Sequence, residues 1–181
     1  MKVKQSVISK RFLPVLAAST LSTMSTYILM LTDSIIAGNM IGTDAVMAIT
    51  LISPIVSFIL FVCYVLSSGT ALAASYHRGR ADDAAVNNVF SHGMAVSVEV
   101  GILMCAVMFL FKDQLLSIWH ISRGAMAYAE EYYTGVILLP LFMGVNLLLY
   151  GLFIGKGKEK MCFAVGITEA VVNVGLSLLL T

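Results

Sequence analysis

Apolar residues dominate long stretches of this chain, and polar residues gather in short intervals between them. Apolar runs of bilayer length occupy five ranges, at about 12–37, 45–75, 86–111, 134–154 and 161–181. Because about 20 helical residues span a hydrocarbon core of roughly 30 Å, each range is long enough for one crossing. The pattern predicts an all-α, polytopic transmembrane bundle of about five helices, forming a single domain over residues 1–181.

The interval 112–133 separates the third and fourth ranges and mixes charged with aromatic residues. Trp119, Tyr128, Tyr132 and Tyr133 are of the types that gather at membrane–water interfaces. We therefore expect this interval to be a connection that lies partly in the interface, with the fourth helix starting near residue 134.

Composition supports a membrane protein. Hydrophobic residues make up 59% of the chain and charged residues 12%, against roughly 45–50% and about 25% in soluble domains. The positive-inside rule assigns the more basic connections to the cytoplasm, which predicts a multi-pass protein of the cell (inner) membrane with a cytoplasmic N-terminus. The cations on that side are Lys2, Lys4, Lys10, Arg11, Arg78, Arg80, Lys156, Lys158 and Lys160, and those opposite are Lys112 and Arg123.

Hydroxyl groups follow one helical face of the first range and lead to a carboxylate. At about 100° per residue, Ser19, Ser22, Thr26 and Asp33 share that face. A carboxylate at membrane depth costs roughly 2.5–3.5 kcal/mol unless it is paired, hydrated or protonated, so Asp33 is a functional candidate.

The second range repeats the hydroxyl pattern on one face. Small hydroxyl residues often join transmembrane helices to one another, but this long row also fits the wall of a water-filled cavity. The residues are Thr50, Ser53, Ser57, Tyr64, Ser68 and Ser75.

Polar residues in the last two ranges extend the candidate cavity. Asn146 and Tyr150 lie four residues apart in the fourth range, and Glu169, Asn173 and Ser177 share a face of the fifth. Glu169 is either a further functional acid or a structural hydrogen-bonding partner of Asn173.

In the third range, Glu99 shares a face with His92 and Asn88. Because they share a face within an apolar range, we expect them to form a buried structural pair.

Several other classes of function lack support. The segment GKGKEK has no P-loop pattern, and the sets of residues that membrane proteases need are missing. Neither the three histidines nor Cys63, Cys105 and Cys162 show metal-ligand spacing. Basic residues flank the apolar ranges, which explains them without nucleic acid. We therefore expect no enzyme activity, no metal and no nucleic-acid partner.

Three segments resemble the multidrug and toxic compound extrusion (MATE) transporters. Asp33 followed by the Gly38–Gly42 turn, and then Ser53-Pro54, resembles the first two helices of that family. HRGRADDAA resembles its second connection, and GKGKEKM resembles its turn between helices 4 and 5. The order of these segments matches over nearly the whole chain.

The resemblance implies a chain that corresponds to helices 1–5 of the first of two six-helix lobes, with the remaining helices as missing partners. It implies export of small organic cations or amphipathic drugs across the lipid bilayer, in exchange for H⁺ or Na⁺ and without another cofactor. The family's ion site then maps to Asp33 and Asn173, with Ser177 where an acid is common and Glu169 as a possible replacement. Ser22, Thr26, Ser53, Ser57, Tyr64, Asn146 and Tyr150 would line the substrate cavity.

Two alternatives stay open. One is a flippase for lipid-linked precursors in the same superfamily, although such sites are rich in Arg and Lys and the apolar ranges here contain neither. The other is a membrane fragment or interaction partner that does not transport by itself, because a transporter needs a second repeat to alternate against.

Overall fold

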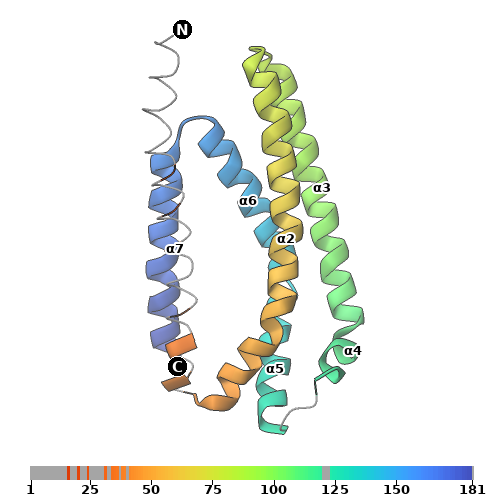
Figure 1. Cartoon of the computed structure of the whole chain (residues 1–181), viewed down its shortest axis with the longest axis vertical. Coiled ribbons are helices and arrows are strands. Elements are labelled where there is room, and N and C mark those ends of the chain that lie inside the picture. The colour runs from red at the N-terminus through yellow and green to blue at the C-terminus, as the bar shows by residue number, and fades with distance from the viewer. Residues whose placement is uncertain are drawn as a thin grey trace. The chain divides into compact units, whose positions relative to one another are not determined.

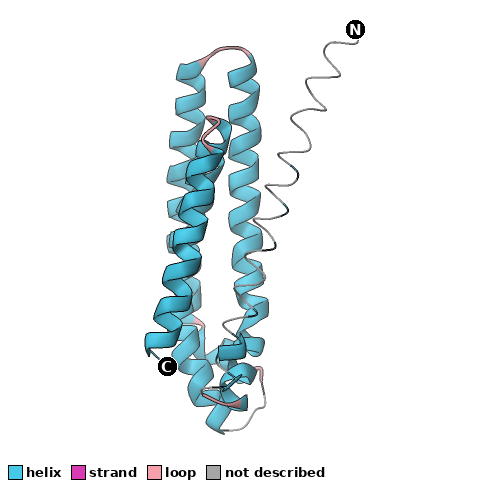
Figure 2. Ribbon diagram, turned by 90° about the vertical axis from the view of Figure 1, so that its left-hand side faces the viewer, coloured by secondary structure: helices cyan, strands magenta, loops and turns pink. Residues whose placement is uncertain are grey.

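The computed structural model describes residues 41–119 and 123–180, together with scattered positions between residues 16 and 39. Every element in that part is a helix, as Figure 2 shows, which confirms the all-α prediction there. The chain divides into two compact units, residues 42–162 and residues 1–41 with 163–181. The packing described below is that of residues 42–162.

Six helices follow one another in the described part (Figure 1). Two of them, α2 and α3, are long and apolar enough to cross a membrane, and α5 and α6 together would form a third crossing, bent by 45°. The first predicted range lies largely outside the described residues. The helices are α2 (Thr43–Gly79), α3 (Asp83–Leu110), α4 (Lys112–Ser117), α5 (Arg123–Val136), α6 (Leu139–Gly155) and α7 (Glu159–Leu180).

The fourth predicted range, 134–154, covers most of α6 and the last residues of a separate helix, α5, which begins at Arg123. Ala125, Ala129, Tyr133 and Val136 recur at helical spacing and are all buried. Tyr133 is fully buried, whereas Tyr128 and Tyr132 are each 39% exposed. This part of the interval 112–133 is therefore a helix that packs against α2, and its place in the interface stays a prediction.

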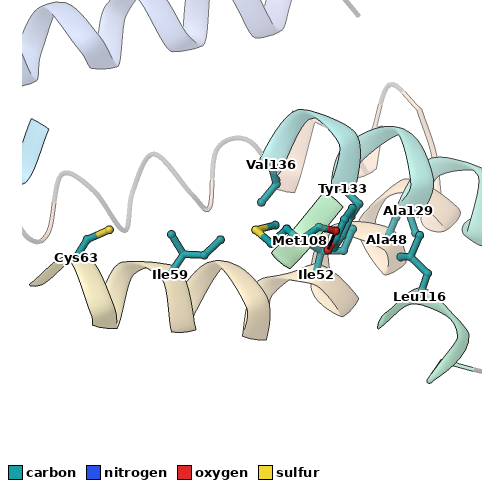
Figure 3. Close-up of a cluster of buried hydrophobic side chains, with 9 residues drawn as sticks. All are labelled: Ala48, Ile52, Ile59, Cys63, Met108, Leu116, Ala129, Tyr133 and Val136. Atoms are coloured by element: carbon teal, nitrogen blue, oxygen red, sulfur yellow. Dashed lines mark hydrogen bonds between the residues drawn. The ribbon is translucent and has the colours of Figure 1, made fainter. Parts of the chain in front are cut away.

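The hydroxyl of Tyr133 explains why a polar residue is tolerated at this depth. It donates a 2.9 Å hydrogen bond to the backbone oxygen of Met108. Met108 lies in the last turn of α3, where carbonyl groups have no partner within the helix. The Tyr133 side chain thus packs in the buried cluster and also satisfies a carbonyl group at the end of α3. Figure 3 shows Tyr133 beside Met108 and Ile52.

The core lies where α2 meets its neighbours. α2 contacts α3, α5 and α6, and α3 also contacts α6. Side chains from α2, α3, α4 and α5 form one buried cluster (Figure 3). Its members are Ala48, Ile52, Ile59, Cys63, Met108, Leu116, Ala129, Tyr133 and Val136.

Small residues allow the helix backbones to approach closely away from this cluster. A Cβ atom added to Gly101 on α3 would lie 2.9 Å from the Cα of Leu141 on α6. One added to Gly144 would lie 3.4 Å from the Oγ of Ser97, a buried hydroxyl with no hydrogen-bond partner in the described part. Such contacts are typical of helix packing in membranes.

Three side chains of α2 add polar contacts to the backbone of α6. Ser67 Oγ donates to the Leu147 oxygen at 2.9 Å, and Cys63 Sγ lies 3.8 Å from the Pro140 oxygen. At the end of both helices, Arg78 Nη1 donates to the oxygen of Gly155. Polar contacts therefore join α2 and α6 at three positions along their length.

Gly101→Ala should destabilise the protein by about 1–3 kcal/mol, since the added methyl group overpacks against the α6 backbone. Gly69→Ala is the control, because nothing lies within 4 Å of its added Cβ and alanine favours a helix by about 1 kcal/mol. Thermal unfolding in detergent, followed by a thiol-reactive dye that reacts with the buried thiols of Cys63 and Cys162 as they become exposed, measures both. Equal melting temperatures for Gly101→Ala and the parent would contradict the close approach.

Candidate functional site

The predicted hydroxyl face of α2 points away from the packed face of that helix. Ile52, Ile59, Cys63 and Ala74 are buried, and at about 100° per residue they lie roughly opposite Ser57, Tyr64 and Ser68. These three side chains are exposed in the described part. The face on which the hydroxyls gather is thus not used for packing against α3, α5 or α6.

Three of the six predicted hydroxyl groups donate hydrogen bonds to backbone oxygens of their own helix. Thr50 donates to the Val46 oxygen at 2.8 Å, Ser53 to Thr50 at 2.8 Å and Ser75 to Leu72 at 2.7 Å. Bonds of this kind back to the preceding turn are common for Ser and Thr within helices. Ser53 therefore has a structural partner, which weakens its assignment to a substrate cavity.

The hydroxyls of Ser57, Tyr64 and Ser68 have no hydrogen-bond partner in the part of the chain that the structure describes. Large apolar side chains lie beside them on α2, with Phe61 64% and Leu72 74% exposed. We call Ser57, Phe61, Tyr64, Ser68 and Leu72 the outer face of α2. It offers hydrogen-bonding groups and aromatic rings together, a combination that suits an amphipathic or cationic organic molecule.

The two candidate residues of α6 differ in their surroundings. Asn146 is exposed and makes no hydrogen bond to another described residue. Tyr150 is half-buried, and its backbone oxygen lies 3.8 Å from Cys162 Sγ. The hydrogen-bonding groups of Asn146 are thus not occupied by any other described residue, whereas Tyr150 lies in the second half of α6, in contact with Cys162 near the start of α7.

Most of the predicted ion-coupling residues lie outside the part of the chain that the structure describes. Asp33 lies outside the described residues, as do Ser22 and Thr26 from the predicted cavity. The side chains of Asn173 and Ser177 on α7 also lie outside them. Glu169 is exposed on α7 and has no hydrogen bond or ion pair to another described residue. Its predicted partner Asn173 lies outside the described side chains, so the structural alternative stays a prediction.

The expected buried pair between Glu99 and His92 is wrong. Both side chains are exposed on α3, and His92 Nδ1 contacts the backbone oxygen of Asn88 at 2.8 Å instead. At a spacing of seven residues their Cα atoms are about 10 Å apart along the helix, which is too far for a direct bond. Glu99 has no partner among the described residues.

Within the described part, no group of three His, Cys, Asp or Glu side chains lies close enough to hold a metal ion. The chemistry available on the outer face of α2 is therefore hydrogen bonding and contact with aromatic and aliphatic surface.

The sequence profile of the MatE family matches residues 18–179. The chain belongs to the MatE family. Its fold is similar to that of a MOP superfamily transporter from Pyrococcus furiosus, with a TM-score of 0.81 and 20% sequence identity. That match covers 89% of this chain and 35% of the transporter, so the chain spans about a third of its length. No curated protein sequence matches.

The Pyrococcus transporter is described as having a binding pocket of reversed polarity, which suggests a different function for it. The polarity of a site in this MatE chain therefore has to be judged from its own residues. The outer face of α2 contains no charged residue, and the sequence has no Lys or Arg from residue 43 to residue 77.

The sequence of this MatE chain did not predict that Ser67 and Arg78, two of the three α2 residues with polar contacts to α6, bind the α6 backbone. Ser67 is next to Ser68 in the sequence. The two can be told apart only by their angular positions on the helix, because Ser67 lies nearer the buried side and Ser68 lies on the outer face. The sequence identifies Arg78 as a cation in a polar connection. It does not indicate the hydrogen bond to Gly155, because the two residues are 77 positions apart.

Cysteine labelling tests whether the outer face of α2 meets water. We expect a membrane-impermeant maleimide to react with Ser68→Cys at least about tenfold faster than with Val107→Cys, because thiolates form only where water reaches them. Val107 is a suitable control, since it is 45% exposed on the apolar surface of α3. Mass spectrometry of the MatE chain in proteoliposomes measures both, and equal rates would place the outer face against lipid.

Proposed function

We propose that this chain is the N-terminal part of a secondary active antiporter. Such a protein exports drugs or other amphipathic or cationic compounds in exchange for H⁺ or Na⁺. Membership of the MatE family and the fold shared with a MOP superfamily transporter support a role in transport. The substrate class and the antiport mode are our inference from the residues.

The observation that carries the substrate class is the outer face of α2. Three hydroxyls without partners in the described part, next to exposed Phe61 and Leu72, would be costly against lipid and useful against a polar ligand. An uncharged hydroxyl can accept a hydrogen bond from an ammonium group, and an aromatic ring attracts a cation through its π-face. A bulky organic cation can use both.

Ion coupling is assigned to Asp33, with Asn173 and Ser177 as neutral partners. A carboxylate that alternates between water and a less polar cavity can take up and release a proton, whereas an amide and a hydroxyl can only donate and accept hydrogen bonds to it. Glu169, exposed on α7, is the second acid that can serve this role.

A flippase for lipid-linked precursors is less well supported. Recognition of pyrophosphate calls for Arg or Lys, and the sequence has neither at 43–77, 83–110 or 124–155. The same composition fits a positively charged substrate, because no cation in these segments repels it.

Tyr64→Ala should raise the KM for export of a fluorescent aromatic cation about fivefold, which corresponds to the loss of about 1 kcal/mol of ring contact. Tyr64→Phe keeps the ring and should stay within about twofold of the parent for this substrate. Phe109→Ala on α3, where Phe109 is 70% exposed, controls for the loss of any exposed ring. Efflux from cells that produce the transporter containing this chain gives these values, and equal KM values for Tyr64→Ala and Phe109→Ala would refute the substrate surface.

Asp33→Asn should abolish coupled export, because an amide cannot carry a proton and binds Na⁺ weakly. Substrate binding, measured by fluorescence anisotropy, should fall much less, since the outer face of α2 is unchanged. Coupled export at the parent rate in Asp33→Asn would contradict the coupling role, and Glu169→Gln then identifies the other acid.

A further inference from the structure

Two basic turns meet at one end of the unit formed by residues 42–162. Arg78, near the end of α2, donates to the oxygen of Gly155 at the end of α6. Figure 1 shows the α2–α3 turn and the end of α6 on the same side, opposite α4 and α5. This is the end that the distribution of charge predicts to be cytoplasmic.

The level of this end relative to a membrane follows from α6. All residues of α6 up to Gly155 are apolar apart from Asn146 and Tyr150, and Lys156 follows at once. The bond from Arg78 to Gly155 therefore places the guanidinium group at the boundary between apolar and polar chain. In a bilayer, that boundary is the level of the phospholipid phosphates.

The turn after α6 fixes the two lysines that follow. Gly157 has a positive φ of 70°, its N–H donates to the Ile154 oxygen at 2.9 Å, and the N–H of Lys158 donates to Phe153 at 2.9 Å. This is the Schellman arrangement that ends many helices. Lys156 and Lys158 are both exposed on this ordered turn.

A fourth cation is held by an aromatic ring. The guanidinium carbon of Arg80 lies 5.7 Å from the ring centroid of Tyr76, and Arg80 Nη1 donates to the Tyr76 hydroxyl at 3.2 Å. Tyr76 is itself 63% exposed. We call Arg78, Arg80, Lys156 and Lys158 the basic cluster.

The charges of the basic cluster are not neutralised within the described part, where none of the four cations forms an ion pair. The acids close to the cluster in sequence are Asp82, Asp83 and Glu159, and Asp82 accepts a hydrogen bond from the Ala85 N–H at the start of α3. Arg78 uses one of its five donors on Gly155, so its other donors are available to an anion.

We propose that the basic cluster binds the phosphate of an anionic phospholipid. The choice of a lipid over free phosphate rests on the apolar surface beside the cluster: Ile154, two residues before Lys156 in the last turn of α6, is 42% exposed. Cations at the phosphate level with apolar side chains beneath them complement both parts of a phospholipid. The proposal does not depend on the transport function.

Native mass spectrometry of the 181-residue chain in detergent, titrated with phosphatidylglycerol or phosphatidylcholine, tests the proposal. Phosphatidylglycerol should bind at least about tenfold more tightly. The double variant Lys156→Gln/Lys158→Gln should weaken that binding about 25-fold, at about fivefold per cation. These lysines are exposed and their side chains hold no helix, so the variant should keep the parent melting temperature.

Lys112→Gln/Arg123→Gln is the matched control, because it removes two cations at the opposite end, from α4 and α5. It should leave the affinity for phosphatidylglycerol within about twofold of the parent. Equal binding of the two lipids, or equal losses in the two double variants, would overturn the proposal. Displacement of phosphatidylglycerol by millimolar inorganic phosphate would also overturn it, because the site would then bind phosphate without using the acyl chains.

Discussion

The close approach of α2, α3 and α6 is the constraint on which the rest of the unit depends. Lipid tails are as apolar as the side chains they touch, so helices in a bilayer gain little from apolar contact alone. What holds them is van der Waals packing at short range and hydrogen bonds between helices. Gly101 against Leu141 supplies the first, and Ser67 bonded to Leu147 supplies the second. A side chain at Gly101 would separate two helices and disturb the contacts of both with α2.

The helical class and the ranges of α2 and α3 could be predicted from the sequence, because each apolar run is long and ends at turn residues. The helix α5 could not. Charged and aromatic residues between 112 and 133 lower the hydropathy, and they hide the helical spacing of Ala125, Ala129 and Tyr133. Packing against α2 decides the structure there, and a hydropathy pattern carries no information about a partner helix.

Helical periodicity in the sequence also predicted part of the candidate site. Helical periodicity assigns Ser57, Tyr64 and Ser68 to one face, and the structure leaves that face exposed. Periodicity does not tell which hydroxyl bonds to its own backbone, because this depends on the side-chain rotamer, and Ser53 proved to be satisfied by Thr50. It also misjudged Glu99 and His92, since sharing a face over seven residues does not bring two side chains into contact.

The bond between Tyr133 and Met108 also bears on how the protein is made. It joins residues 25 positions apart, so the last turn of α3 gains this partner only after the ribosome has added Tyr133. Until then, the Met108 carbonyl needs water or another donor, since an unsatisfied carbonyl in hydrocarbon is costly. The end of α3 therefore completes its hydrogen bonding only after the ribosome has made most of α5.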